Sequence, residues 1–184
     1  MPPSTASKTN ILHRFRRNRR GSAAVEFALI APMFFAVLFA IIELALVFFA
    51  SQILETVTQD TARLIMTGQA QNASYTQALF KEKVCAKLTI MFDCLNGVSI
   101  DVQNYKEFTA VDVSDPIVTD PKDGKKKFVP PNNYLPGGPG DIVVVRLFYK
   151  WPLLVTGLGF NVANIADSKR LLTATAAFQN EPYN

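Results

Sequence analysis

Histidine and cysteine are scarce in this chain, and their scarcity excludes several kinds of chemistry. The only histidine among the 184 residues is His13, in the basic N-terminal stretch, so no Ser-His or Cys-His pair is expected in the rest of the chain. Cys85 and Cys94 are the only cysteines, and two cysteines without a nearby histidine do not make a zinc pattern. We therefore expect no catalytic residue, no bound metal and no cofactor, and we predict that the protein is not an enzyme.

Acidic side chains are missing from residues 1–20, which contain six of the 19 lysines and arginines. The remainder has 13 basic and 15 acidic side chains, so the basic isoelectric point belongs to this N-terminal arm. A stretch of arginines can bind nucleic acid. The apolar segment that follows explains the charges instead, because the positive-inside rule keeps such an arm in the cytoplasm. We therefore expect no nucleic-acid partner.

Long apolar runs are also rare, because only one reaches the length needed to cross a membrane. Residues 27–50 are 24 residues with a single charge, Glu43, and at about 1.5 Å of rise per residue they span a hydrocarbon core of about 30 Å. We predict a single-pass protein in the lipid bilayer, with a cytoplasmic leader at 1–21 and a transmembrane helix at 22–50. Pro32 is expected to kink this helix, and no role is assigned to Glu43.

The rest of the chain predicts a small α+β domain beyond the membrane. The helix is expected to continue over 51–70, with Gly68 as its C-terminal stop, and residues 71–184 form the domain. A short helix is expected over 74–88, and a long surface loop with six prolines and four glycines over 115–141. Period-two alternation predicts an antiparallel sheet of three to four strands. Its strands are expected at 98–102, 108–113, 142–151 and 171–179, with a Gly-Leu-Gly-Phe turn at 157–160.

Cys85 and Cys94 are both predicted to lie on the far side of the membrane from the arm. In an oxidising compartment two nearby thiols usually pair. We therefore expect a disulfide, which would close a short loop and stabilise the domain by about 2–3 kcal/mol. Two buried free thiols are the alternative.

The junction between the arginines and the apolar run carries the strongest functional signal. Four small residues, Gly21-Ser-Ala-Ala24, are followed by Glu26, just inside the apolar run. A charged residue near the middle of a membrane helix costs about 2.5–3.5 kcal/mol, so such a carboxylate needs a partner. If a peptidase cut between Gly21 and Ser22, the new ammonium on Ser22 would lie about one helical turn from Glu26, within one chain or between chains.

This junction resembles that of type IV prepilins and, more closely, that of the TadE-like family of tight-adherence (Flp) pilus assembly proteins. Both have a short basic leader that ends in glycine, and the family adds a Val-Glu-Phe-Ala-Leu box and a proline a few residues on. The matching residues here are Val25, Glu26, Phe27, Ala28, Leu29 and Pro32. The ending Ala176-Ala-Phe-Gln-Asn-Glu-Pro-Tyr183 is similar to the aromatic, Asn-Glu-Pro ending of many family members.

The resemblance implies a minor pilin or pseudopilin with a pilin-like fold, processed by a prepilin peptidase at Gly21 and Ser22. Glu26 would then be the charge that guides assembly. The implied partners are the peptidase, other pilin-like subunits, an assembly ATPase and the inner-membrane assembly platform. The implied location is the bacterial inner membrane, with the N-terminus cytoplasmic and the C-terminal domain periplasmic, or the pilus itself.

Two alternatives stay open at this point. The first is an uncleaved, single-pass membrane-anchored periplasmic protein that works in binding or adhesion, with the loop at 115–141 as its contact surface. The second is an anchored periplasmic enzyme, which would need a cluster of polar residues that only the folded chain can bring together. Retention of residues 1–21 in the mature protein would favour the first alternative.

Overall fold

The computed structural model describes residues 21–88, 91–155 and 161–183. It divides into two compact units, Met1–Ile41 and Ile42–Asn184, and the boundary falls inside one helix, α2 (Ser22–Met66). The 45 residues of α2 confirm the long helix expected from the sequence, including its start at Ser22.

The first unit, over residues 21–41, consists of the N-terminal part of α2. Its large apolar side chains are exposed, and Leu29 is 76% exposed. Within the described residues, α2 is the one helix long and apolar enough to cross a membrane. Pro32 lies inside α2. The kink expected at this proline stays a prediction.

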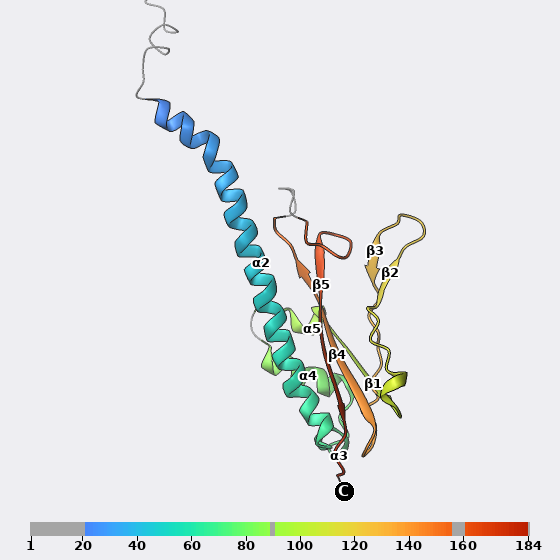
Figure 1. Ribbon diagram of the computed structural model, residues 1–184. Helices are drawn as coiled ribbons and strands as arrows, with labels where there is room; N and C mark the ends of the chain where they lie inside the picture. Colours follow the sequence, from blue (N-terminus) through green and yellow to red (C-terminus); the bar gives the residue numbers. More distant parts are fainter. Residues whose placement is uncertain (1–20, 89–90, 156–160, 184) are drawn as a thin grey trace, which may run out of the picture. The chain divides into compact units, whose positions relative to one another are not determined.

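The second unit contains short helices and an antiparallel sheet, which confirms the α+β prediction. Three strands form the sheet in the order β1-β4-β5, and β2 and β3 form a separate hairpin. After α2 the elements are α3 (Gln69–Asn72), α4 (Gln77–Lys87), α5 (Cys94–Gly97), β1 (Val98–Tyr105), the 3-10 helix η2 (Phe108–Ala110), β2 (Ile117–Thr119), β3 (Lys126–Phe128), β4 (Ile142–Pro152) and β5 (Lys169–Gln179). Figure 1 shows their arrangement.

Strand β4 is the centre of this unit and is covered on both faces. Its residues from Ile142 to Tyr149 are all buried. Because successive side chains of a strand point to opposite faces, Leu147 joins the main core whereas Phe148 joins a smaller cluster that includes residues of the β2–β3 hairpin. Burial on both faces explains why this strand is an almost continuous apolar run and does not alternate.

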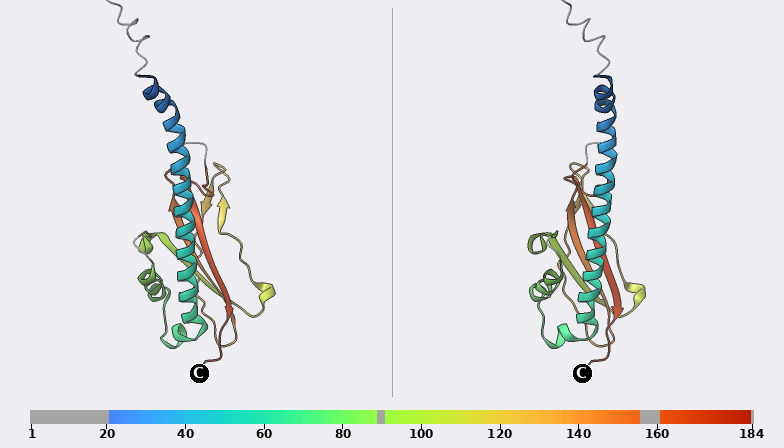
Figure 2. Two further views of the ribbon diagram at one scale, coloured as in Figure 1. Left: turned by 60° about the vertical axis from the view of Figure 1, so that its left-hand side comes forward. Right: turned by 90° about the vertical axis from the view of Figure 1, so that its left-hand side faces the viewer.

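The C-terminal part of α2 provides the helical side of the main core. Both views of Figure 2 show this part of the helix running along the sheet. Its buried apolar side chains recur at steps of three to five residues, which places them on one face of the helix. They are Val47, Ala50, Leu54, Val57, Ala62 and Ile65. Phe80 and Val84 of α4 join the same core.

The short helix, the last strands and the disulfide follow the predictions. Helix α4 falls within the expected 74–88, and β1, β4 and β5 occupy the positions expected for three of the strands. Cys85 and Cys94 are joined in a disulfide that links α4 to α5, with a Cα–Cα distance of 5.5 Å. The turn expected at 157–160 lies outside the described residues.

The strand predicted at 108–113 is wrong. Residues Phe108–Ala110 form an exposed 3-10 turn, although the local sequence alternates. The outer edge of β1 is occupied by a later segment, because the Val102 N–H donates to Asn133 O at 2.9 Å and the Leu135 N–H donates to Val102 O at 2.9 Å. With that part of the edge taken, the 108–113 segment has no strand to pair with there.

The loop predicted at 115–141 is partly wrong as well, because it contains the β2–β3 hairpin. The Asp120 N–H donates to Lys125 O at 2.9 Å across the hairpin turn. Lys127 of β3 forms an ion pair of 2.6 Å with Asp120. This pairing raises the pKa of Lys127 and lowers that of Asp120.

Candidate functional site

The N-terminal junction lies at the first turn of α2. Ser22 begins the helix, and its hydroxyl Oγ donates to Glu26 Oε1 at 2.9 Å, so the carboxylate lies beside the first residue of the helix. Both side chains are exposed. A Cβ added to Gly21 would meet no described atom within 4 Å, so packing among the described residues gives no reason for a glycine there. The arrangement can accept a positive charge at Ser22.

The family-motif residues around Glu26 are not part of a core within the chain. Val25, Phe27 and Leu29 are all exposed. Ala28 is exposed too, and Pro32 lies one turn further along the helix. Apolar side chains in such number and density need lipid or another helix to cover them.

Glu43 is a functional candidate that sequence reasoning left without a role. It belongs to the second unit and is only 9% exposed. Its Oε1 accepts hydrogen bonds from the backbone N–H groups of Leu154 and Val155, the second at 3.1 Å, and its Oε2 lies 3.2 Å from the Val155 nitrogen. The donors are 111 and 112 residues away and are backbone groups, which leave no signal in the sequence.

The C-terminal ending closes the far end of α2. The N–H of Glu181 donates to Met66 O at 2.9 Å and satisfies one of the helix's last carbonyls. The Tyr183 ring lies against Gly68, where a Cβ would come within 2.3 Å of the ring. Gly68 also has a φ of +74°, a conformation that favours glycine. The Gly68 stop predicted from the sequence therefore serves both the helix end and the aromatic ending.

Asp141 and Asn180 connect this ending to the sheet. The Asp141 carboxylate accepts hydrogen bonds from the Gly138 N–H at 3.0 Å, from Lys106 Nζ at 2.5 Å and from Asn104 Nδ2 at 3.3 Å. The bond from Gly138, followed by that from Lys106, lowers the pKa of Asp141 to about 2. The Asn180 N–H donates to Asp141 O at 2.8 Å, and Asn180 itself is buried. The ending is thus bonded to the backbone of Asp141, whose carboxylate fixes the neighbouring segment at Gly138.

A buried ion pair on the sheet is a second feature that sequence reasoning missed. Arg146 Nη2 lies 2.7 Å from Asp101 Oδ2, and the two residues are directly opposite each other on β4 and β1. Arg146 Nη1 donates to Ser114 O at 2.9 Å, and Asn133 Nδ2 donates to Asp101 Oδ1 at 2.9 Å. The pair therefore fastens two loop segments to the sheet. Because both side chains are buried and satisfied, we interpret it as structural.

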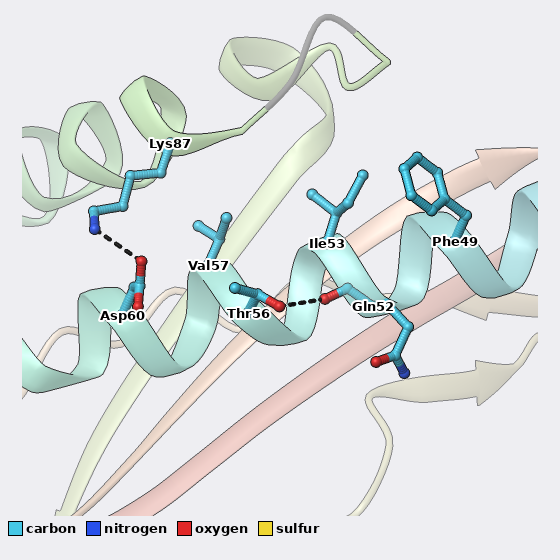
Figure 3. Close-up of a pocket in the computed structure, with 7 residues that line it drawn as sticks. All are labelled: Phe49, Gln52, Ile53, Thr56, Val57, Asp60 and Lys87. Atoms are coloured by element: carbon cyan, nitrogen blue, oxygen red, sulfur yellow. Dashed lines mark hydrogen bonds and ion pairs between the residues drawn. The ribbon is translucent and has the colours of Figure 1, made fainter.

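A shallow pocket of about 480 Å³ lies along α2 beside α4. It is lined by Phe49, Gln52, Ile53, Thr56, Val57, Asp60 and Lys87. Figure 3 shows Lys87 reaching from α4 to Asp60, which it pairs with at 3.0 Å, and Thr56 Oγ1 turned back to its own helix at Gln52 O. The polar groups thus serve one another and do not converge on the pocket. It offers an apolar surface for packing and has no nucleophile–base pair.

The N-terminal junction lies within a segment that matches a known protein family. Residues 21–63 match the family model described as TadE-like protein, and the match includes both Glu26 and Glu43. The resemblance drawn from the junction is therefore confirmed over this segment, whereas the C-terminal ending lies outside the match. No curated protein and no solved structure matches the chain. Over this segment the chain is similar to TadE-like proteins, and the segment lies within α2, the helix that is long and apolar enough to cross a membrane.

Proposed function

From the TadE-like segment we propose that this protein is a minor pilin-like subunit for the assembly of a tight-adherence pilus. It has no enzymatic activity, is anchored in the bacterial inner membrane by α2, and carries its second unit in the periplasm. The observation that carries the proposal is the family match over residues 21–63. The basic arm, which precedes the match, sets the orientation by the positive-inside rule.

Processing at the junction supplies the partner that Glu26 needs. A prepilin peptidase cleaves between Gly21 and Ser22, so that Ser22 carries a free ammonium. The contact of 2.9 Å between Ser22 Oγ and Glu26 Oε1 supports this idea, because the carboxylate already reaches the first residue of the mature chain. Charges attract more strongly where water is excluded. In an assembled array, Glu26 neutralises the ammonium of a neighbouring subunit and sets the register of the helices.

The apolar surfaces described above are the contacts through which the subunit assembles. The exposed side chains of residues 22–41 face lipid before assembly and the helices of other pilin-like subunits afterwards. The pocket beside α4 adds a second surface of the same character. The inner-membrane platform transfers the subunit between these two environments.

Mass spectrometry of the membrane-bound protein tests the processing step. In cells with the prepilin peptidase the chain should begin at Ser22, and in cells without it the chain should keep residues 1–21. Gly21→Leu should block cleavage, whereas Thr5→Leu, elsewhere in the leader, should be processed normally. A chain that keeps its leader in both strains would instead support the uncleaved membrane-anchored binding or adhesion protein.

A charge replacement tests the role of Glu26. Removing one partner of a buried ion pair costs about 3–5 kcal/mol, so Glu26→Gln should lower the number of pili by more than about tenfold while membrane insertion is retained. Glu55→Gln is the matched control, because Gln59 Nε2 donates to Glu55 Oε1 at 3.1 Å in the same i, i+4 relation on the same helix. Normal piliation in the Glu26→Gln strain would contradict the proposal.

A further inference from the structure

The contact of Glu43 with the segment after β4 brings an apolar loop to a defined height on the anchor helix. The β4 strand ends at Pro152, and the next two residues are Leu153, which is buried, and Leu154. Leu154 is 85% exposed, the largest value for any large apolar side chain among the described residues. Its own N–H donates to the Glu43 carboxylate. A leucine is therefore held outward by a hydrogen bond that fixes its backbone.

The surface around this contact is apolar on the helix as well. Ile42, Leu46 and Phe49, which are close in sequence to Glu43 on α2, are all exposed. In the same stretch, Val47 and Ala50 are buried in the core of the second unit. Residues 43–50 therefore have one face packed against the folded unit and another that is apolar and uncovered.

Helix length indicates where along α2 the hydrocarbon core ends. Residues 22–42 are 21 residues, which at about 1.5 Å of rise per residue give about 31 Å, the thickness of the hydrocarbon core. Glu43 thus follows a complete span that begins at the junction. A span extended to Ala50 would draw the packed side of the folded unit into the hydrocarbon.

We propose that the outer boundary of the hydrocarbon core lies at Glu43, and that Leu154 at the end of β4 is a second lipid contact at that boundary. This places the end of the span earlier than the 22–50 predicted from sequence. The proposal rests on the membrane anchor in the proposed function and does not depend on pilus assembly.

The hydrogen bonds of Glu43 explain how a loop can approach lipid. Irregular backbone is not found exposed to lipid, because its unpaired N–H groups lose their water without gaining a partner. Here the N–H groups of Leu154 and Val155 both point to the Glu43 carboxylate. The carboxylate in turn receives the donors that an acidic side chain needs on leaving water. Each group removes the cost of placing the other at the membrane surface.

Site-specific fluorescence in vesicles tests the lipid contact. The two native cysteines are joined, so a cysteine introduced into the full-length protein can be labelled alone with an environment-sensitive fluorophore. The protein is reconstituted in phosphatidylethanolamine–phosphatidylglycerol vesicles with nitroxide-labelled lipid, or with iodide outside. Leu154→Cys is compared with Val129→Cys, an exposed apolar position of the same unit, and with Phe39→Cys inside the span.

The label at Leu154 should be quenched by shallow nitroxide lipid and not by iodide, as for a group about 5–10 Å into the headgroup and acyl boundary. The label at Val129 should be quenched by iodide alone, and that at Phe39 by deep nitroxide lipid. Iodide quenching at Leu154 as strong as at Val129 would overturn the proposal. Shielding of Leu154 from both quenchers would also overturn it and would indicate a protein partner. Iodide quenching at Phe39 would remove the membrane anchor and the proposal with it.

A second variant tests the part played by the carboxylate. Glu43→Gln removes the negative charge and replaces Oε2, which lies 3.2 Å from the Val155 nitrogen, with an NH2 group that cannot accept from it, so the label at Leu154 should lose part of its lipid quenching and gain iodide quenching. Glu55→Gln should leave the lipid quenching and the iodide quenching of this label unchanged. The emission of Trp151, the only tryptophan, shows whether the second unit is still folded. Unchanged lipid quenching in a folded Glu43→Gln protein would refute the role of Glu43. The result for the labelled protein with its native Glu43 tests the lipid contact by itself.

Discussion

The two parts of α2 are both rich in apolar side chains but differ in their pattern of burial. Over residues 21–41, Ala40 is the only buried side chain. Over residues 42–66, buried side chains recur at steps of three and four, and they include polar ones. One face of the second part is thus covered by its own chain, whereas the first part needs covering from outside. Apolar composition shows that a helix will be buried, but the periodicity shows what buries it.

Polar groups differ between the two parts in the same way. In the second part, Thr58 and Thr61 donate to helix carbonyls at 2.7 Å, and Glu43 accepts from the loop after β4. In the first part, Glu26 has the hydroxyl of Ser22 as its partner within the described residues. These polar groups of the second part therefore have their partners within the chain. Under the proposed function, the charge of Glu26 in the first part gains its partner only when the leader is cleaved.

Two leucines on α2 provide the largest expected contrast. Leu54 is fully buried and Leu38 is 37% exposed. Leu54→Ala should lower the free energy of unfolding of the second unit by about 2–5 kcal/mol, because it leaves a cavity in the main core. Leu38→Ala should leave that free energy unchanged.

The measurement is urea unfolding of the full-length protein in detergent, followed by the emission of Trp151. This tryptophan lies on β4 and its ring is 6.0 Å from that of Phe92, so it reports on the second unit. Equal losses in the two variants would mean that the parts of α2 are not independent in the way their burial indicates.

Glycine substitutions sharpen the comparison at the far end of the helix, with a smaller effect. Gly68 and Gly124 both have positive φ, at +74° and +66°, but only a Cβ at Gly68 meets another group, the Tyr183 ring. Gly124→Ala should cost about 1–2 kcal/mol, the usual cost of this backbone conformation. Gly68→Ala should cost more, because the C-terminal ending must also move. If Gly68→Ala costs no more than Gly124→Ala in the same unfolding experiment, the ending does not stabilise α2.

Local patterns in the sequence predicted much of this fold. The start of α2 at Ser22, its stop at Gly68 and the strand β4 each follow from residues within a few positions of one another. The approach of Ser22 to Glu26 was also accessible, because residues four apart on a helix are neighbours. Glu26 could thus be singled out as a candidate without any knowledge of the rest of the chain.

Contacts that depend on tertiary structure could not be predicted in this way. Asp101 and Arg146 are 45 residues apart, and their pairing requires the register of β1 against β4. Glu43 pairs with backbone groups, which every residue except proline possesses. The 108–113 segment alternates like a strand, but pairing also requires a free edge, and the edge of β1 is taken near Val102. In each case the missing information was which distant segment packs against a given residue or strand edge.

The smallest expected effect concerns acid and separates the folded unit from the apolar helix. The pKa of Asp141 is lowered to about 2 in the folded protein, from its ordinary value of 3.8, by hydrogen bonds from Gly138 and Lys106. A carboxyl group whose pKa is lowered by folding stabilises the folded state at any pH above its pKa in the unfolded chain. This stabilisation should therefore be lost as the pH falls from about 4 toward 2. Asp141→Asn should be less stable than the natural protein at pH 7, and the difference should shrink over that range. Asp115→Asn, at an exposed position, should show no such trend in Trp151 emission. A constant difference between Asp141→Asn and the natural protein from pH 7 to pH 2 would show that the charge of Asp141 does not stabilise the second unit.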